Sequence, residues 1–187
     1  MNIVLDLDET LVSVSSKPYK SYDFSFELGT FKYYAKKRPN LTLFLRYIFK
    51  YFNTVNVWTA ATRPYAEQIL NNILNKTQLL KLNYFLTRED LLITKNGDIS
   101  KPLQKIFKSP SNKKGLRPNN TIMIDDKKSA VINNLGNAII VPVFKGSTKD
   151  IALAKLMIVL DGILKYGPEM SLCKYKKEFT LNELTKL

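Results

Sequence analysis

The chain has 187 residues, a length that suits one domain with a sizeable core, and its 45% of hydrophobic and 24% of charged residues are ordinary for a globular protein. It contains no histidine, which excludes histidine-based metal sites and Ser-His-Asp catalysis, and its one cysteine excludes a disulfide within the chain. The net charge of +13 favours phosphates, nucleic acids or acidic peptides as partners, although a lysine-rich coat that aids solubility has the same composition.

Strands and helices alternate along the first half of the chain. Residues 2–7 are an apolar strand, and residues 22–36 alternate in polarity about Gly29-Thr30, which predicts a β-hairpin. The further elements predicted in this half are a helix from Pro39, a strand at residues 54–59, a helix from Pro64 and a short strand at residues 84–86.

The second half continues this alternation. The elements predicted here are a loop through Gly97, a helix at residues 101–107, a strand at 121–125, a helix at 129–135, a strand at 138–141 and a long helix at 148–164. Such alternation indicates an α/β fold, a parallel sheet flanked by helices on both faces. Ligands of these sheets bind at the carboxyl ends of the strands.

Acidic residues follow the first predicted strand directly. The apolar run Ile3-Val4-Leu5 leads into Asp6 and Asp8, and the hydroxyl of Thr10 comes two residues later. Carboxylate oxygens beside an apolar strand suit Mg²⁺. The simpler alternative is a buried strand followed by a solvated acidic turn.

Two other predicted strands also end on polar side chains. Thr59 ends one strand, and Asp125 and Asp126 end another. Each has an ordinary structural explanation, since Thr59 could cap a helix and the acidic pair could form a solvated turn. Because the carboxyl ends of parallel strands meet at one edge, we expect these groups and Asp6 to converge on one cleft.

The string Asp6-Leu-Asp8-Glu-Thr10-Leu-Val after a strand resembles the first motif of the haloacid-dehalogenase (HAD) phosphotransferase superfamily. Within it, the order of segments is similar to that of the C-terminal-domain phosphatases of RNA polymerase II and the NLI-interacting-factor-like small phosphatases. The matching segments are Leu5–Val12, Lys37-Arg-Pro-Asn-Leu41, Trp58-Thr-Ala60 with Tyr65-Ala66, Thr87-Arg-Glu89, Lys101-Pro-Leu103 and Ile124-Asp-Asp126. The resemblance implies a HAD-type Rossmann-like sheet with a small β-hairpin insert after the first motif.

The resemblance also implies a role for each acidic residue. Asp6 would be the nucleophile that forms an aspartyl-phosphate. Asp8 would be the general acid that protonates the leaving alkoxide, and then the base that activates water. Mg²⁺ would be held by Asp6, the backbone carbonyl of Asp8 and Asp126, with Asp125 orienting the lysine or a metal-bound water.

The phosphate contacts implied by the resemblance involve neutral and basic groups. Thr59 and the backbone N–H of Ala60 would hold a phosphate oxygen, and Thr10 is also expected at the substrate. Lys101 would balance the charge of the transition state. Lys105 is the alternative, since relatives commonly have Lys-Asp-Leu where this chain has Lys101-Pro-Leu103.

Arg88 is a further candidate for the substrate. The family resemblance implies that its guanidinium could fork onto the incoming phosphate. The alternative is a surface arginine paired with Glu89 or Asp90.

The domain expected from the resemblance covers residues 1–165, with the β insert at 13–37 and a polar tail at 166–187. Relatives often place an aromatic residue close after the first motif, where it packs against a substrate proline. This chain has Ser13-Val-Ser-Ser-Lys-Pro18 there instead, a departure that concerns recognition of the polymerase tail and not phosphatase activity.

Basic residues cluster after the lysine motif. Six cations and no acid lie between Lys101 and Arg117, and we expect them to border the cleft: Lys101, Lys105, Lys108, Lys113, Lys114 and Arg117. There they could steer an acidic phosphopeptide or a nucleic-acid end. The alternative is a solvated lysine-rich loop.

The function expected is that of a Mg²⁺-dependent phosphatase of phosphoserine and phosphothreonine in proteins, with the RNA polymerase II C-terminal domain as one candidate substrate. Two alternatives are a phosphatase of nucleic-acid ends or nucleotides and a non-catalytic phosphopeptide-binding scaffold. A single cysteine and a catalytic motif that begins at Asp6 favour an intracellular, reducing compartment, nuclear or cytoplasmic. No apolar run is long enough for a membrane partner to be expected.

Overall fold

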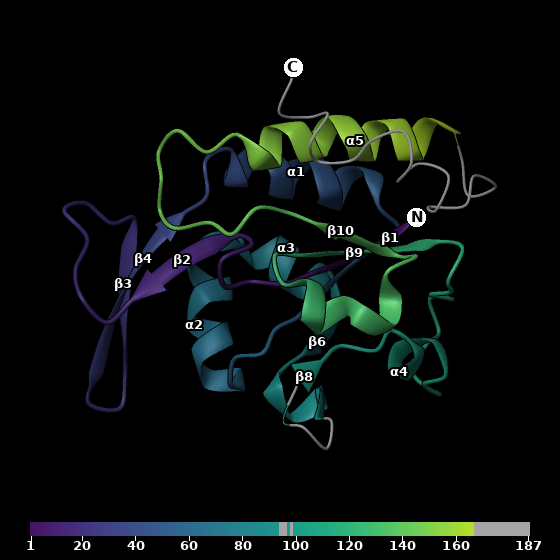
Figure 1. Ribbon diagram of the computed structural model, residues 1–187, viewed down its shortest axis with the longest axis horizontal. Helices are drawn as coiled ribbons and strands as arrows, with labels where there is room; N and C mark the ends of the chain where they lie inside the picture. Colours follow the sequence, from purple (N-terminus) through teal and green to yellow (C-terminus); the bar gives the residue numbers. More distant parts are fainter. Residues whose placement is uncertain (94–96, 98, 167–187) are drawn as a thin grey trace.

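A five-stranded parallel sheet forms the centre of the fold in the computed structural model, which describes residues 1–93, 97 and 99–166 (Figure 1). Across the sheet the strands are ordered β10-β9-β1-β5-β6. Their bounds are Asn2–Leu5 (β1), Thr54–Trp58 (β5), Leu82–Leu86 (β6), Thr121–Asp125 (β9) and Ala138–Ile140 (β10). Leu5 lies opposite both Val57 and Ile124, so the residues that follow these strands emerge at one edge. The predicted fold class is therefore confirmed.

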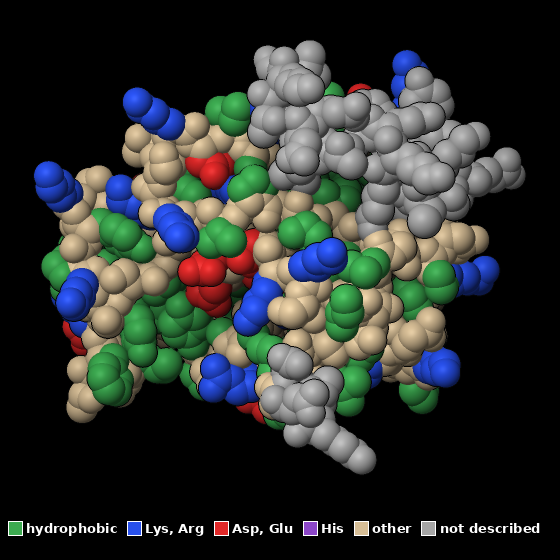
Figure 2. All heavy atoms as spheres, in the orientation of Figure 1, with side chains coloured by type: hydrophobic (Ala, Val, Ile, Leu, Met, Phe, Trp, Pro, Cys, Tyr) green, Lys and Arg blue, Asp and Glu red, His purple; other side chains and the backbone are tan. Residues whose placement is uncertain are grey.

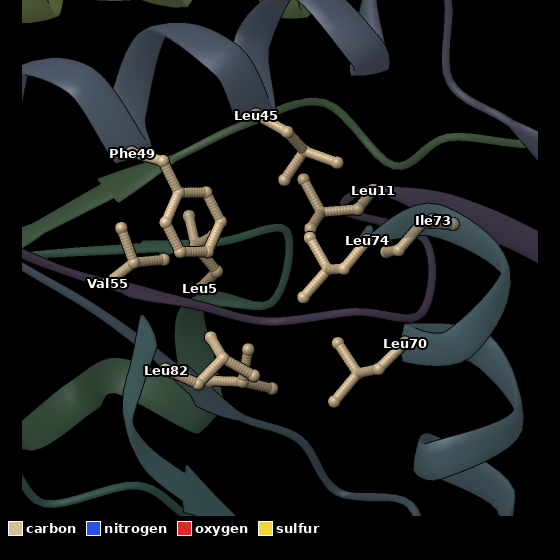
Figure 3. A pocket seen from close by; sticks show the side chains of 10 residues that line it. Leu5, Leu11, Leu45, Phe49, Val55, Leu70, Ile73, Leu74 and Leu82 are labelled. Carbon is tan, nitrogen blue, oxygen red and sulfur yellow. The ribbon is translucent and has the colours of Figure 1, made fainter. Parts of the chain in front are cut away.

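Side chains of β1 alternate between two cores. Ile3 and Leu5 belong to the larger core, whereas Val4 packs with Trp58 in the smaller one. The helices of the larger core are α1 (Leu41–Tyr51), α2 (Arg63–Ile73) and α5 (Ala152–Tyr166), and those of the smaller core are α4 (Gln104–Phe107) and the 3-10 segment η2 (Lys128–Asn134). Figure 3 shows apolar side chains of the sheet, α1 and α2 converging in the larger core.

A second, antiparallel sheet follows β1 and projects from the main sheet (Figure 1). Its strands are β2 (Val12–Ser15), β4 (Phe31–Lys37) and β3 (Phe24–Leu28), in that order across the sheet. The hairpin predicted about Gly29 is confirmed, because Leu28 pairs with Phe31 and Gly29 adopts a φ of 60°, which glycine tolerates. The rings of Phe26 and Tyr33 pack against Tyr65 of α2, which anchors the insert beside the main sheet.

Several helices begin later than the sequence predicts. α1 begins at Leu41 rather than at Pro39, because Asn40 has a φ of 66° and stands outside the helix. α5 begins at Ala152 rather than Thr148, because the Asp150 carboxylate accepts the N–H of Ala152 at 2.9 Å and so caps the helix.

Two other predicted helices are shorter or of another kind. Only Gln104–Phe107 of the helix expected at 101–107 is α-helical, since the N–H of Lys101 bonds to the carbonyl of Ala130 instead. The helix expected at 129–135 is the 3-10 segment η2, which is interrupted at Val131.

Short elements were not predicted. These are β2, α3 (Lys76–Lys81), the 3-10 turn η1 (Arg88–Asp90) and the ribbon of β7 (Leu92–Ile93) and β8 (Ile99–Ser100). The sequence did carry a signal for α3, because Asn75 and Gln78 form a capping box. Part of the predicted loop about Gly97 and residues 167–187 of the predicted tail lie outside the described residues. Within the part of the chain that is described, no helix is long and apolar enough to cross a membrane.

Neutral polar side chains connect the strands at the amino edge of the sheet. Asn2 donates to the side chain of Asn120 at 3.0 Å and accepts from the hydroxyl of Thr54 at 3.0 Å. Asn56, fully buried, donates to Thr54 at 3.0 Å and accepts from Asn83 at 3.0 Å. These buried groups therefore satisfy one another across β9, β1, β5 and β6.

Candidate active site

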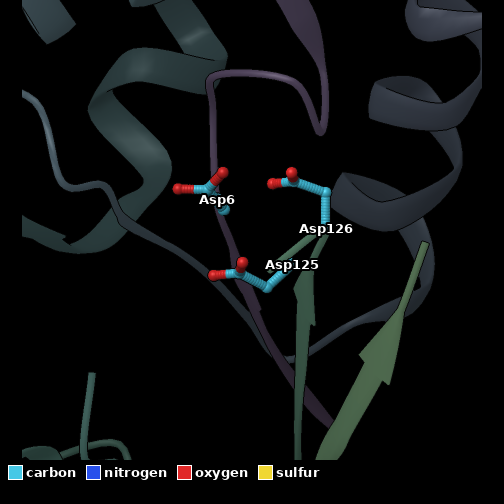
Figure 4. A group of neighbouring side chains, drawn as sticks. All are labelled: Asp6, Asp125 and Asp126. Atoms are coloured by element: carbon cyan, nitrogen blue, oxygen red, sulfur yellow. The ribbon is translucent and has the colours of Figure 1, made fainter. Parts of the chain in front are cut away.

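Three carboxylates meet at the opposite, carboxyl edge of the sheet. Asp6 follows β1, Asp125 ends β9 and Asp126 follows it, and one oxygen of each lies within 4.8 Å of the others (Figure 4). The N–H of Asp6 donates to the carbonyl of Ile124 at 3.0 Å, which continues the pairing of β1 with β9 and sets the spacing of the carboxylates. A cluster of hard oxygen donors with this spacing can hold a divalent cation such as Mg²⁺.

A tight turn after β1 carries Asp8 and Thr10 around this cluster. The N–H groups of Leu11 and Val12 both donate to the carbonyl of Leu7, and Glu9 takes a left-handed φ of 60°. Thr10 is fully buried, and its hydroxyl donates to Asp126 at 3.1 Å. This contact positions Asp126, and the substrate contact expected of Thr10 stays a prediction.

Lys101 lies between two of the carboxylates. Its buried ammonium group donates to Asp6 at 2.5 Å and to Asp125 at 2.7 Å. Asn134 fixes the backbone on either side, because it donates to the carbonyl of Lys101 at 2.6 Å and accepts the N–H of Leu103 at 2.9 Å. Lys105, the alternative, instead contacts the carbonyl of Asp90 at 2.9 Å, so Lys101 is the lysine at the carboxylates.

The electrostatics of the Asp6–Lys101 pair follow from its burial. Burial raises the pKa of Asp6 well above its ordinary value, an effect that Lys101 opposes and Asp125 reinforces. Burial alone would lower the pKa of Lys101, but the adjacent carboxylates of Asp6 and Asp125 raise it, so the ammonium stays charged. Asp6 therefore depends on neighbouring positive charge to remain a carboxylate.

Asp8 has a separate environment. Burial raises the pKa of its carboxyl group, while the hydroxyl of Tyr65, which donates to it at 2.8 Å, opposes this rise. A carboxyl group that holds its proton to higher pH is suited to act as a general acid. Sequence reasoning did not assign Tyr65 to the site, although the matching segment Tyr65-Ala66 carried the signal.

A pocket of about 460 Å³ opens beside Asp8, on the side of β5 and β6. Tyr33 and Leu28 of the insert form one wall, and residues 60–62, Tyr65 and Arg88 form the other. Arg88 is exposed and donates to the carbonyl of Ala60 at 3.0 Å. Among the described residues it forms no salt bridge with Glu89 or Asp90, the partners of the alternative interpretation, and Asp90 lies 3.5 Å from Lys105. The guanidinium of Arg88 therefore faces the pocket that a substrate would enter.

Thr59 follows β5 and directly precedes Ala60, which lines this pocket. Its hydroxyl is buried and accepts the N–H of Ala61 at 3.1 Å, and its own N–H donates to the carbonyl of Leu86 at 3.0 Å. The loop after β5 is thus held against the end of β6. Thr59 and Ala60 stand at the third strand end, as the sequence predicts.

Arg38 is a buried residue that sequence reasoning missed. It donates to both carboxylate oxygens of Asp150 at 2.9 Å and to the carbonyl of Thr10 at 2.9 Å. It therefore ties the catalytic turn to the loop after β10. The signal was the Lys37-Arg-Pro segment, but the partner lies 112 positions away in the sequence.

The predicted cation cluster does not border the site as a unit. Asn120 accepts the N–H of Arg117 and donates to the carbonyl of Gly115, and it also contacts Asn2 at the start of β1. Arg117 and the turn with Lys113 and Lys114 therefore lie at the amino edge of the sheet. The prediction was wrong here because it extrapolated from sequence distance to Lys101, whereas the chain runs back to the start of β9.

Comparisons with known proteins show the family of this chain. The sequence model of the NLI interacting factor-like phosphatase family matches residues 1–170. A Dictyostelium discoideum protein named as a C-terminal domain small phosphatase is 33% identical over 167 residues, covering 87% of this chain and 50% of its own length. A CTD phosphatase-like protein of Invertebrate iridescent virus 6 is 34% identical over 155 residues, 71% of this chain and 81% of its own. This chain thus spans half the length of the first relative.

Solved structures with the same fold include Fcp1, described as an essential RNA polymerase II CTD phosphatase, with a TM-score of 0.59 and 21% identity over 95% of this chain and 52% of that one. A protein of Listeria monocytogenes has a TM-score of 0.59 and 18% identity over 89% of this chain and 99% of that one. At these identities the structures establish the fold alone. The family match over residues 1–170 shows that the chain belongs to the NLI interacting factor-like phosphatase family.

Proposed function

We propose that residues 1–165, with the insert at 13–37, form a Mg²⁺-dependent phosphatase domain that hydrolyses phosphoserine and phosphothreonine in proteins. The observation that carries the proposal is the different environment of two nearby carboxylates. Asp6 accepts a hydrogen bond from Lys101 and lies close to Asp125 and Asp126. Asp8 instead accepts a hydrogen bond from Tyr65, and burial raises its pKa. The donor to Asp6 is thus an ammonium group and the donor to Asp8 a neutral hydroxyl, and two nearby carboxylates in such different environments suit a nucleophile and a general acid.

In the first step, an oxygen of Asp6 attacks phosphorus and the bond from phosphorus to the serine oxygen breaks. Oδ1 of Asp6 accepts from the ammonium of Lys101, which favours the charged, nucleophilic form of the carboxyl group. Asp8 transfers its proton to the departing alkoxide, which leaves as the serine hydroxyl. The product on the enzyme is an acyl phosphate on Asp6.

In the second step, Asp8 is a carboxylate and accepts a proton from water as the water oxygen attacks phosphorus. The acyl–phosphate bond breaks, inorganic phosphate leaves, and Asp6 and the protonated Asp8 are regenerated. Lys101 keeps its charge throughout and compensates the negative charge on Asp6 and phosphate. Tyr65 orients the Asp8 carboxyl group in both steps.

The acidic cluster fits a divalent metal. Asp6, Asp125 and Asp126 offer only hard oxygens, and Lys101 balances just one unit of their charge. Asp6, Asp126 and the carbonyl of Asp8 would hold Mg²⁺, which when bound neutralises charge on the phosphoryl group. Thr10 would keep Asp126 oriented toward it. The raised pKa of Asp126, caused first by burial and then by Asp125, is a further reason to expect a cation there.

The pocket beside Asp8 supports a protein substrate. Leu28, Tyr33 and Tyr65 offer apolar and aromatic surface for a side chain next to the phosphorylated residue, and Arg88 offers a fork for the phosphate. A Mus musculus relative and Fcp1 are both named for the C-terminal domain of RNA polymerase II, which makes that phosphorylated tail one substrate to assay.

Turnover of phosphoserine peptides, compared with 3′- and 5′-phosphorylated oligonucleotides, tests the proposal. We expect Mg²⁺-dependent release of phosphate from the peptides, loss of activity in excess EDTA and recovery on adding Mg²⁺ back. Asp126→Asn should need a higher Mg²⁺ concentration for half-maximal rate. Full turnover in EDTA would contradict the metal-assisted mechanism, turnover of oligonucleotides alone would indicate a nucleic-acid-end phosphatase, and peptide binding without turnover would indicate a scaffold.

A further inference from the structure

Lysines line the side of the active site that faces away from the aromatic pocket. We call Lys36, Lys127, Lys128, Lys145 and Lys149 the basic rim. The pocket lies at the ends of β5 and β6, whereas Lys127 and Lys128 follow β9, and Lys145 and Lys149 lie in the loop after β10. Because β1 separates these pairs of strands in the sheet, pocket and rim flank Asp6 on opposite sides. Figure 2 shows acidic side chains at the centre of this face with Lys and Arg side chains around them.

Backbone contacts place the rim beside the catalytic turn. The N–H of Val141 donates to the carbonyl of Asp125 at 2.9 Å, and the N–H of Phe144 donates to the carbonyl of Glu9 at 2.7 Å. The loop that carries Lys145 and Lys149 is thus hydrogen-bonded both to the end of β9 and to the turn that follows β1. Lys36 of β4 joins it, since its ammonium lies 3.4 Å from the carbonyl of Gly146.

The loop is also fixed from inside. Arg38 donates to the carbonyl of Pro142 at 2.7 Å, in addition to its contacts with Asp150 and with Thr10. A buried arginine with all these partners cannot move without breaking several charged hydrogen bonds. The backbone under the rim therefore keeps its position relative to Asp6.

Positive charge on the rim is not compensated locally. Among the described residues, no salt bridge involves any of the five rim lysines. Arg38 already pairs with Asp150, the acid of this loop, and its hydrogen bonds keep the pKa of Asp150 below its ordinary value although burial opposes this. Two other acids lie near the loop. Asp126 accepts a hydrogen bond from Thr10 and belongs to the carboxylate cluster of the active site, whereas Glu9 is exposed to solvent.

From this arrangement we infer that the basic rim binds additional negative charge on the substrate, carried by acidic residues or a second phosphorylated residue on one flank of the target phosphoserine. The inference rests on the proposed function. A peptide whose phosphate lies at Asp6 would have one flank at the pocket of Tyr33 and Tyr65 and the other at the rim. The two surfaces would therefore fix the direction in which the peptide binds, with an apolar residue on one side of the phosphoserine and an acidic segment on the other.

The surroundings of the rim favour an acidic peptide over a nucleic acid. Proteins that bind single strands combine cations with exposed aromatic rings on which bases stack. Near the rim, Phe144 is buried, and the ring of Tyr19 is covered by the ammonium of Lys36 at 5.5 Å from its centre. The described residues of the rim therefore offer charge without a stacking surface.

Two matched double variants test this inference. Lys145→Gln/Lys149→Gln removes two exposed rim charges, and Lys113→Gln/Lys114→Gln removes two exposed charges at the amino edge of the sheet. Each variant and the parent are assayed on five substrates: a phosphoserine peptide with neutral flanks, one with Asp and Glu on the N-terminal flank, one with them on the C-terminal flank, one with a second phosphoserine, and an aryl phosphate. Comparing the acidic peptides with the doubly phosphorylated one separates carboxylate from phosphate as the source of the charge.

We expect the rim variant to lower kcat/KM for the charged peptides by about three- to tenfold relative to the aryl phosphate, from the usual strength of exposed ion pairs. The effect should appear for one flank only and should shrink as salt is raised, because salt screens exposed charges. The amino-edge variant should leave all ratios unchanged.

Equal losses on neutral and charged peptides, or equal losses in both variants, would overturn the inference. A rim-dependent loss on phosphorylated oligonucleotides, with none on charged peptides, would assign the rim to nucleic acid and overturn it as well. Failure of the proposed function looks different, because then the parent protein releases phosphate from no peptide at all.

Discussion

The two edges of the central sheet both bury polar side chains, but of different kinds. At the amino edge, Asn2, Thr54 and Asn56 are neutral and satisfy one another. At the carboxyl edge, Asp6, Asp125 and Lys101 are ionisable and packed at hydrogen-bond distance. Neutral amides and hydroxyls hold the strands in register at all pH values, whereas the buried charges depend on one another, on pH and on a cation. The same strands thus have a structural edge and a chemical edge.

Lys101→Met, at the chemical edge, should have the largest effect of the substitutions considered. It leaves Asp6 and Asp125 buried without their ammonium partner, so we expect kcat/KM to fall by about 10³-fold or more. The free energy of unfolding in EDTA should fall by about 3–5 kcal/mol at pH 8. The stability loss should shrink toward pH 5, where the Asp6 carboxyl group, whose pKa burial raises, can bind a proton.

Urea denaturation across this pH range measures the effect, and Lys105→Met is the matched control. Lys105 is exposed and contacts Asp90, so its removal should change stability by less than about 1 kcal/mol. A loss for Lys101→Met that is the same at pH 5 and pH 8 would argue against buried carboxylates as its cause.

Asp8→Asn should show that activity and stability oppose each other at the chemical edge. Turnover of a phosphoserine peptide should fall by about 10²- to 10⁴-fold, since no proton reaches the leaving group. Because burial raises the pKa of Asp8 in the folded state, the folded protein binds this proton more tightly than the unfolded chain. The free energy of unfolding should therefore fall as the pH rises from about 4 through the folded pKa.

Asparagine cannot titrate, so the variant should lack this fall and become the more stable protein at high pH. Thermal unfolding of both proteins in EDTA from pH 4 to pH 9 measures the difference. A variant that is less stable than the parent by a constant amount at every pH would show that Asp8 is not destabilised by its burial.

Asn56→Ala addresses the structural edge. Asn56 donates to the carbonyl of Ile3 at 2.8 Å as well as to Thr54, and its loss removes these two hydrogen bonds and the acceptor of the Asn83 amide. We expect the free energy of unfolding to drop by about 1–3 kcal/mol, equally at pH 5 and pH 9, because no ionisable group is involved. The kcat of the folded variant should stay within about twofold of the parent. A changed pH–rate profile would mean that the two edges are not independent.

Tyr65→Phe has the smallest expected effect. The hydroxyl of Tyr65 stabilises the charged form of Asp8, so its removal should raise the pKa of Asp8 and move the basic limb of the pH–kcat/KM profile to higher pH. The rate at the optimum should fall by less than about tenfold. Tyr33→Phe is the control, because its ring packs on Tyr65 at a centroid distance of 5.5 Å while Asp8 keeps its donor. A basic limb that shifts equally in both variants would assign the effect to packing.

The sequence was sufficient to predict the parts of the site that sit at strand ends. Asp6, Thr59 and Asp125 each follow or end a strand, and register between parallel strands brings such positions to one edge. The sheet was predictable for the same reason, since its strands are short apolar runs between helices. Local spacing is all that these predictions require.

Contacts between distant segments could not be predicted in this way. Arg38 and Asp150 lie 112 positions apart, and their pairing decides both where α5 begins and where the loop after β10 lies. The choice between Lys101 and Lys105 likewise depended on which ammonium reached Asp6. The error about Arg117 has the same origin, because sequence proximity to Lys101 does not report on which edge of the sheet a turn lies.

The central claim is that Asp6 is the nucleophile and Asp8 the acid and base, and trapping of the covalent intermediate tests it most directly. Asp8→Asn and Asp6→Asn are mixed rapidly with nitrophenyl phosphate, whose leaving group needs no proton, and their intact masses are measured. Asp8→Asn should release a burst of nitrophenol and gain one phosphate, because the water that completes the cycle is not activated. Asp6→Asn should gain none. A phosphate on Asp6→Asn and none on Asp8→Asn would contradict the assigned roles.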